Sequence, residues 1–164
     1  MIKISKSTLF NPAKIWISGI ECSFKNIIKI TNMIDYKWVV VTIDSLEKDS
    51  ALLKVIKEQR LKFSLDKQSA DYIEISVAIP HVLFETILEK AISEDPENIF
   101  IFNLLIPTNN NIYSQHSGEE LIAIGITDAF ISIALDKNSL LISVNKSFIE
   151  PQGLYKKIKA LQFD

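Results

Sequence analysis

Residues 119–150 read EELIAIGITDAFISIALDKNSLLISVNKSFIE, and this stretch decides the fold. Every second side chain is a branched aliphatic between residues 131 and 135, and the same holds between residues 140 and 144. A period of two is typical of a strand that has one face in a core. The intervening DKNS, residues 136–139, turns readily. The two runs therefore predict a β-hairpin, and residues 121–126 predict a third strand beside it.

Outward from this hairpin, similar patterns predict most of the remaining elements. Strands are expected at residues 13–24, 36–43, 61–65, 71–79 and 99–106, the last of them buried on both faces. Apolar residues at helical spacing predict helices at residues 46–60, from Pro80 onward, and at residues 151–161, with Asp44 as a candidate N-cap for the first. Helices do not alternate strictly with strands, so we expect an α+β fold: a mostly antiparallel sheet with about three helices packed on it. Residues 1–164 contain no linker or repeat and predict a single domain.

Composition limits the class of protein. The chain has 164 residues, 48% of them hydrophobic, and a mean hydropathy of +0.19, enough to bury roughly 70% of the surface that it exposes when unfolded. Its apolar runs are far shorter than the roughly 20 residues that a membrane-spanning helix needs. The start of the chain lacks the apolar segment of a signal peptide, and the lone Cys22 cannot form a disulfide framework. We expect a cytoplasmic protein without a membrane partner.

The charge distribution argues against a nucleic-acid partner. The formal net charge is −2, and no run of basic residues stands out. Arg60 is the single arginine, so any phosphate recognition would depend on the point charges of lysines.

Residues with catalytic chemistry are scattered. Ser114, His116 and Glu119 are the residue types of a nucleophilic triad, but contiguous residues in one loop rarely form one, so a polar loop is favoured. Cys22 alternates with Ile20 in an apolar pattern, which favours a core thiol. His81 is the only other histidine in the chain. We therefore expect no catalytic residues and no enzymatic activity.

Metal and cofactor signals are equally weak. Glu94, Asp95 and Glu97 surround a proline, and a turn that ends a helix explains them without an ion. None of the four glycines lies in a phosphate-binding pattern. Trp16 and Trp38 lie on predicted strands, where a core role is favoured over base stacking. We expect neither a metal nor a cofactor.

The longest stretch without a pattern is residues 107–118, and the loop of residues 107–120 that contains it is the candidate partner-binding site. Loops of more than about 12 residues in compact domains are usually functional or mobile, and both interpretations stay open here. We expect Tyr113 to anchor a partner, with Glu119 and Glu120 at the rim. The exposed faces around Asp71 and Glu74 are the next candidate. The full set of candidate binding residues is Asn109, Asn111, Tyr113, Gln115, His116, Glu119 and Glu120.

The size, mild acidity, α+β pattern and Ile/Lys/Asn-rich usage in YKWVVVTI (residues 36–43), NNNIYSQ (109–115) and ALDKNSLLISVNK (134–146) carry a resemblance. The chain resembles the immunity proteins of bacterial contact-dependent growth-inhibition and related polymorphic toxin systems. That resemblance implies a protein partner, a cognate toxin domain that is often a nuclease, whose active site is covered. The alternative is a small cytosolic enzyme or ligand-binding domain with a pocket between sheet and helices. An exposed strand edge would also allow a homodimer.

Overall fold

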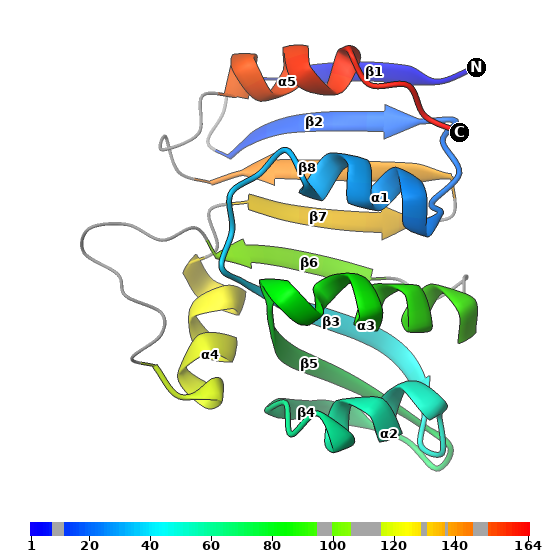
Figure 1. The fold of residues 1–164 in the computed structure, drawn as a ribbon, viewed down its shortest axis with the longest axis vertical. Helices are drawn as coiled ribbons and strands as arrows, with labels where there is room; N and C mark the ends of the chain where they lie inside the picture. The colour runs from blue at the N-terminus through cyan, green and yellow to red at the C-terminus, as the bar shows by residue number, and fades with distance from the viewer. Residues whose placement is uncertain (8–11, 95–99, 106–115, 129–130, 137, 146–150) are drawn as a thin grey trace.

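An antiparallel sheet forms the body of the protein in this computed structural model, which describes residues 1–7, 12–94, 100–105, 116–128, 131–136, 138–145 and 151–164 (Figure 1). Eight described strands lie in the order β1-β2-β8-β7-β6-β3-β5-β4, with every neighbouring pair antiparallel. The expected α+β class and antiparallel sheet are therefore confirmed. The strands are β1 Lys3–Ser7, β2 Ala13–Ser18, β3 Trp38–Glu47, β4 Phe63–Gln68, β5 Tyr72–Pro80, β6 Phe100–Leu105, β7 Ile131–Asp136 and β8 Ser139–Val144.

The predicted hairpin is confirmed. Strands β7 and β8 pair with Ile133 opposite Ile142, and both side chains are buried. The hairpin lies inside the sheet, because β6 pairs with the other side of β7 and β2 pairs with the other side of β8. Its alternating aliphatic residues therefore form part of the central core.

The first helix is a feature that the sequence did not reveal. The predicted strand at residues 13–24 ends early, because Gly19 adopts a φ of +74° and turns the chain after β2. Helix α1 (Phe24–Thr31) then begins with Ser23 as its N-cap, whose hydroxyl accepts a hydrogen bond from the Asn26 backbone N–H. Its buried Ile27 and Ile30 are too few to establish a helical period in the sequence.

The predicted strand at residues 121–126 is wrong, because this segment lies in helix α4 (Gly118–Asp128). Ser117 starts the helix: its hydroxyl oxygen accepts a hydrogen bond from the Glu120 backbone N–H at 3.2 Å. Leu121 and Ile122 are buried on one side of the helix and Gly125 packs closely against Val40. The apolar run is too short to separate strand from helix by pattern alone.

Helix α2 (Ala51–Glu58) is shorter than predicted, and Asp44 is not its N-cap. Strand β3 continues to Glu47 because Leu46 and Glu47 still pair with β5. The actual cap is Ser50, whose hydroxyl oxygen accepts a hydrogen bond from Leu53 N–H at 3.0 Å. Pairing between strands therefore outweighs the local helix signal at Asp44.

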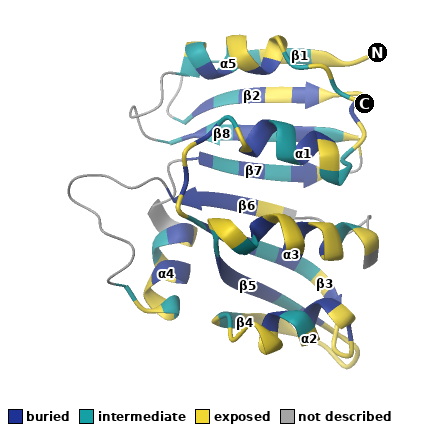
Figure 2. Cartoon of the chain, in the orientation of Figure 1, coloured by how far each residue is buried: buried dark blue, intermediate teal, exposed yellow. Residues whose placement is uncertain are grey.

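The described residues contain five helices instead of about three. The two that have not yet been introduced are α3 (His81–Glu94) and α5 (Pro151–Lys159). Helices α1, α2, α3 and α5 cover one face of the sheet, where their apolar residues join Ile15, Val39 and Ile133 in the main core. Helix α4 packs on the opposite face, against Val40 and Ala78. Alternation along the strands separates these two layers (Figure 2). No helix among the described residues is both long and apolar enough to cross a membrane.

Two burial expectations are wrong, both on the α4 face. Trp16 was expected in the core but is 40% exposed, and Ile101 in β6 is 37% exposed although its strand was expected to be buried on both faces. Both side chains point away from the four-helix layer and toward the α4 face, where the sheet is only partly covered. Trp38 is half-buried beside α4.

Candidate functional site

The last residues of β3 and β4 and the first residues of β5 lie together at one end of the strands. The turn between β4 and β5 is closed by Ser69 and Tyr72: Ser69 N–H donates to the Tyr72 carbonyl at 2.9 Å, and Tyr72 N–H donates to the Ser69 hydroxyl oxygen at 3.2 Å. The Lys48 N–H donates to the Asp71 carbonyl at 3.2 Å. The turn is therefore held beside the end of β3.

Both strands that flank β5 contain a bulge close to this turn. One lies between Ile43 and Leu46 in β3, and the other between Leu65 and Lys67 in β4. Within the first, Ser45 has a φ of +56°, a left-handed conformation that costs about 1–2 kcal/mol for a residue with a Cβ. Bulges bend a strand and redirect its side chains, and strained residues of this kind cluster at functional sites.

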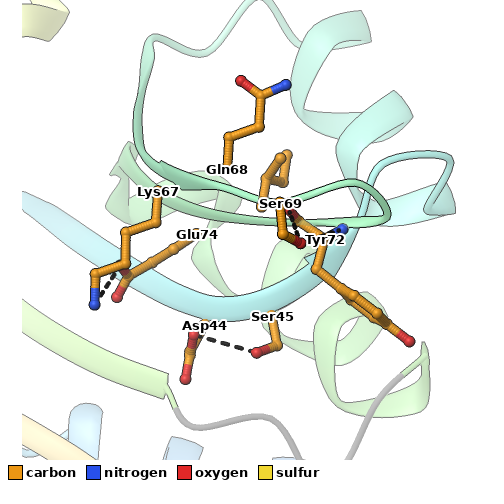
Figure 3. Close-up of a pocket in the computed structure, with 8 residues that line it drawn as sticks. Asp44, Ser45, Lys67, Gln68, Ser69, Tyr72 and Glu74 are labelled. Atoms are coloured by element: carbon orange, nitrogen blue, oxygen red, sulfur yellow. Dashed lines mark hydrogen bonds and ion pairs between the residues drawn. The ribbon is translucent and has the colours of Figure 1, made fainter.

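Tyr72 stands between two hollows and is 46% exposed. The hollow on the β3 bulge side has a volume of about 270 Å³, and the one beside the end of β3 about 460 Å³. Figure 3 shows the first hollow, with Asp44 and Ser45 of β3 facing the β4–β5 hairpin. We call the lining residues the Tyr72 surface: Asp44, Ser45, Glu47, Lys48, Asp49, Lys67, Gln68, Ser69, Ala70, Asp71, Tyr72, Ile73 and Glu74.

The Tyr72 surface is strongly acidic. Its two lysines, Lys48 and Lys67, face five carboxylates, a local balance of −3 in a chain whose net charge is −2. The Lys67 ammonium lies 3.8 Å from the Glu74 carboxylate, but its side chain is 82% exposed, so solvent weakens this ion pair. Negative charge is therefore concentrated at this end of the molecule. The five acidic residues are Asp44, Glu47, Asp49, Asp71 and Glu74.

A hydrogen-bonded row of hydroxyls supports the surface from the neighbouring part of the sheet. The Asp66 carboxylate accepts hydrogen bonds from the Ser64 hydroxyl at 2.8 Å and from the Ser76 hydroxyl at 2.6 Å. The Ser76 oxygen also lies 3.0 Å from the Thr42 hydroxyl oxygen. These bonds connect β4, β5 and β3 and fix the backbone that carries the Tyr72 surface.

The chemistry of the site suits recognition of a cationic surface. Neither His81 nor His116 lines the two hollows, and the His81 ring instead packs 4.9 Å from that of Tyr36. Cys22 is half-buried with its sulfur 3.6 Å from the Ser139 carbonyl oxygen, and burial raises the pKa of its thiol. No group of three or more His, Cys, Asp or Glu side chains among the described residues is placed to hold a metal ion. An exposed tyrosine among carboxylates offers both an anchor and charge for a basic partner.

The candidate residues of the 107–120 segment are only partly described. Asn109, Asn111, Tyr113 and Gln115 lie outside the described residues, as do Ser114 of the triad pattern and Asp95 and Glu97 of the acidic turn.

The other three candidates lie at the start of α4, where His116 is half-buried and Glu119 and Glu120 are exposed. A hydrogen bond from its own backbone N–H, and then the Lys62 ammonium 3.5 Å away, hold the pKa of the Glu119 carboxyl below its usual value. Glu120 accepts a hydrogen bond from the Ser117 hydroxyl at 3.2 Å. The two acids thus begin a helix instead of preceding a strand.

The structure does not bring Glu119 and Glu120 to the Tyr72 surface, because α4 starts beside Lys62 and Tyr72 lies beyond the opposite end of β4. The second candidate from the sequence, Asp71 and Glu74, does lie on it. Tyr72 itself was not among the sequence candidates, although alternation in DYIEISVAI directs Tyr72 and Glu74 away from the buried isoleucines. The residues contributed by β3 could be found only from the strand order.

Comparison with known proteins adds little to this description. No model of a protein family and no curated protein sequence matches the chain significantly. Among solved structures, the ligand-free regulatory subunit of aspartate kinase from Thermus thermophilus matches with 9% sequence identity, over 78% of this chain and 95% of that chain. The TM-score of this match is 0.27, which is too low to support an argument about fold or function.

Proposed function

We propose that the chain is an immunity protein that binds a cognate toxin domain of the nuclease class in the cytoplasm and covers its active site with the Tyr72 surface. The observation that carries the proposal is the exposed Tyr72 ring between two hollows that five carboxylates line. Nucleases hold phosphates with lysines and arginines, so a surface with a local charge of −3 is complementary to such a site.

The two components of the Tyr72 surface have different roles. The Tyr72 side chain provides apolar contact area with few rotatable bonds, which is the usual character of a binding anchor. The carboxylates attract the basic face of the toxin and accelerate the encounter, over a range of about 8 Å at physiological ionic strength. The hydrogen bonds of Asp66 hold the supporting strands, so binding requires little ordering of the backbone.

Growth protection tests this function. The chain is co-expressed with the toxin domain encoded immediately upstream of its gene, and survival is measured for the parent and for Tyr72→Ala. We expect the parent to protect and Tyr72→Ala to lose about 2 kcal/mol of binding energy, roughly a thirtyfold loss of affinity. Val82→Ala is the matched control, because Val82 is 83% exposed on α3, on the opposite face of the sheet. Absence of a toxin gene there, or no protection by the parent, would overturn the proposal.

Charge reversal tests the surface separately from the anchor. Glu47→Lys with Asp71→Lys should slow association with the toxin domain at low salt by about tenfold, and added salt should reduce the difference. Glu85→Lys with Glu89→Lys, both exposed on α3, makes the same change in net charge away from the Tyr72 surface. Equal slowing by both pairs would show that only net charge matters and that the binding surface lies elsewhere.

A further inference from the structure

Half of the sheet face that carries α4 has no helix on it in the described part of the chain. Helix α4 packs across β6, β3, β5 and β4. The other described helices lie on the opposite face, in front of the sheet in Figures 1 and 2, so no described helix covers the half formed by β1, β2, β8 and β7, which we call the open half. A sheet face normally buries its apolar side chains against a second layer.

An apolar strip crosses the open half from β2 and ends on the adjoining strand β6. Trp16, Leu141, Ala134 and Ile101 are direct cross-strand neighbours in β2, β8, β7 and β6, a row about 14 Å long at ordinary strand spacing. Trp16 and Ile101, at its two ends, are 40% and 37% exposed. Lys14 lies on the same face of β2, two residues before Trp16. Lys3 of β1 pairs with Ser18 on this same face, and neither strand contains a carboxylate, so this end of the strip is basic.

The outer side of α4 is complementary to the open half in charge and in apolar character. Glu119, Ala123 and Ile126 follow one another at helical spacing and are exposed, Ile126 by 55%. The acidic first turn, which also contains Glu120, lies beside β4, and Gly125 near the other end lies against Val40 of β3. The helix therefore offers acid at its start and an aliphatic side chain near its end.

We propose that the open half binds α4 of a second copy of this chain, so that two copies form a two-fold homodimer with both α4 helices between the two sheets. A two-fold axis parallel to the strands reverses the strand order and brings the acidic start of one α4 onto Lys14 of the other copy. Because α4 follows the row of Ala78 and Val40, which is in register with Lys14, Ile126 then lies beside the strip of Trp16 and Ile101, two residues along the strands from it. An axis perpendicular to the strands would instead keep the strand order, so that α4 would face α4 and the basic β1 ends would face each other. Only the first arrangement therefore places α4 on the open half, and charge favours it as well.

The available area agrees with a stable pair. Four strands about 4.8 Å apart and about 17 Å long give a footprint of roughly 330 Å². A two-fold axis generates the contact twice, so each copy contributes this patch and the outer side of its α4, on the order of 700 Å² against about 800 Å² per partner in a standard interface. Pairing through a strand edge is less suitable, because edge strand β1 carries Lys3 and Lys6 and edge strand β4 contains a bulge.

The dimer does not depend on the proposed toxin binding. Ala78 lies beneath α4, six residues along β5 from Tyr72, which separates the two surfaces by roughly 20 Å along the strand. A variant that blocks dimerisation should therefore keep the Tyr72 surface intact, and failure of one proposal leaves the other to be judged by its own experiment.

Sedimentation equilibrium of the purified full chain tests the dimer. The parent at high micromolar concentration should have a mass of about 37 kDa, twice 18.6 kDa. Trp16→Glu should give the monomer mass, whereas Val82→Glu on the opposite face should leave the dimer unchanged. A monomeric parent, or a dimer that survives Trp16→Glu, would overturn the proposal.

A charge exchange identifies the contact itself. Lys14→Glu alone, and Glu119→Lys with Glu120→Lys alone, should each weaken the dimer by about tenfold or more, because each creates like-charge contacts twice in the pair. Mixed in equal amounts, the two variants should form a heterodimer close to parental affinity, since both contacts are then between opposite charges. Such restoration requires both chains to be folded. Failure of the mixture to associate, with both variants folded by circular dichroism, would contradict the proposed contact.

Discussion

The two faces of the sheet differ in how their apolar residues are covered. On one face four helices enclose a continuous core that extends from Ile15 in β2 to Val77 in β5. On the other face α4 is the one described helix and covers a small cluster around Val40 and Ala78, while much of the rest is polar or only partly buried, including exposed Trp16 and Ile101. We infer that the first face provides most of the folding free energy, and that the second is available for recognition.

The sharpest test of this difference is one substitution made on each face. Ile133 in β7 is 1% exposed in the main core, whereas Ile101 in neighbouring β6 points to the second face and is 37% exposed. Ile133→Ala should lower the free energy of unfolding by about 2–5 kcal/mol. Ile101→Ala should lower it by no more than about 1 kcal/mol, because its site can refill with water. Urea unfolding at a protein concentration that keeps the chain monomeric measures both, and equal losses would contradict the contrast.

The next effect concerns the single helix of the second face. A Cβ added to Gly125 would overlap Val40 Cγ2, so α4 must move away from the sheet. Gly to Ala inside a helix normally stabilises it by up to about 1 kcal/mol. Here we expect Gly125→Ala to destabilise the protein by about 1–3 kcal/mol, as for overpacked cores.

Val40→Ala is the matching change, since it removes the two Cγ methyls that the new Cβ would meet and leaves only the Cβ of residue 40 in its way. In the double variant the cost of Gly125→Ala should fall by at least about 1 kcal/mol, measured as a coupling energy in a double-mutant cycle. Strict additivity would show that α4 does not pack on β3 through this contact.

The contrast between the faces also explains which parts of the fold could be predicted from the sequence. The hairpin of β7 and β8 was predictable because one of its faces is fully buried and the other is not, which produces a clear period of two. Helices α1 and α4 were not, since each has only two or three inward apolar residues. The exposure of Trp16 was not predictable either, because it depends on where α4 lies and not on β2 itself.

The Tyr72 surface was predictable only in part, for a related reason. Alternation along β5 identifies Tyr72 and Glu74 as outward residues, and the second candidate site from the sequence lies there. Asp44 joins them through the antiparallel pairing of β3 with β5 and a bulge after Ile43, and a sequence pattern contains neither. The sequence also predicts a helix at residues 46–60, so Glu47 was not expected to lie on a strand.

A smaller effect tests whether the hydroxyl row stabilises the second face. Ser76 is 1% exposed, and its hydroxyl donates to Asp66 at 2.6 Å. Ser76→Ala should lower the free energy of unfolding by about 1–2 kcal/mol, the usual value for a hydrogen bond to a charged group that retains access to water. Ser5→Ala, on an exposed position of β1, is the control and should change it by less than about 0.5 kcal/mol. If Ser76→Ala and Ser5→Ala changed the free energy of unfolding equally, the hydrogen-bonded row of hydroxyls would not hold the strands together.

The smallest expected effect is a pH dependence on the helix-covered side, at Cys22. Burial raises the pKa of this thiol above its ordinary value of 9.0, so the folded chain keeps the proton at a pH where the unfolded chain has released it. The folded state then binds more protons than the unfolded state, and stability must fall as the pH rises above about 9.

Tyr36, whose pKa burial also raises, adds a slope of the same sign, so the parent curve alone cannot assign the effect. Cys22→Ser removes the thiol and leaves Tyr36, so the difference between the two unfolding free energies should narrow as the pH rises through that range. If the difference instead stays constant from neutral to alkaline pH, Cys22 is as well solvated in the folded chain as in the unfolded one. Cys22 would then be a solvated residue of the surface and not part of the helix-covered core.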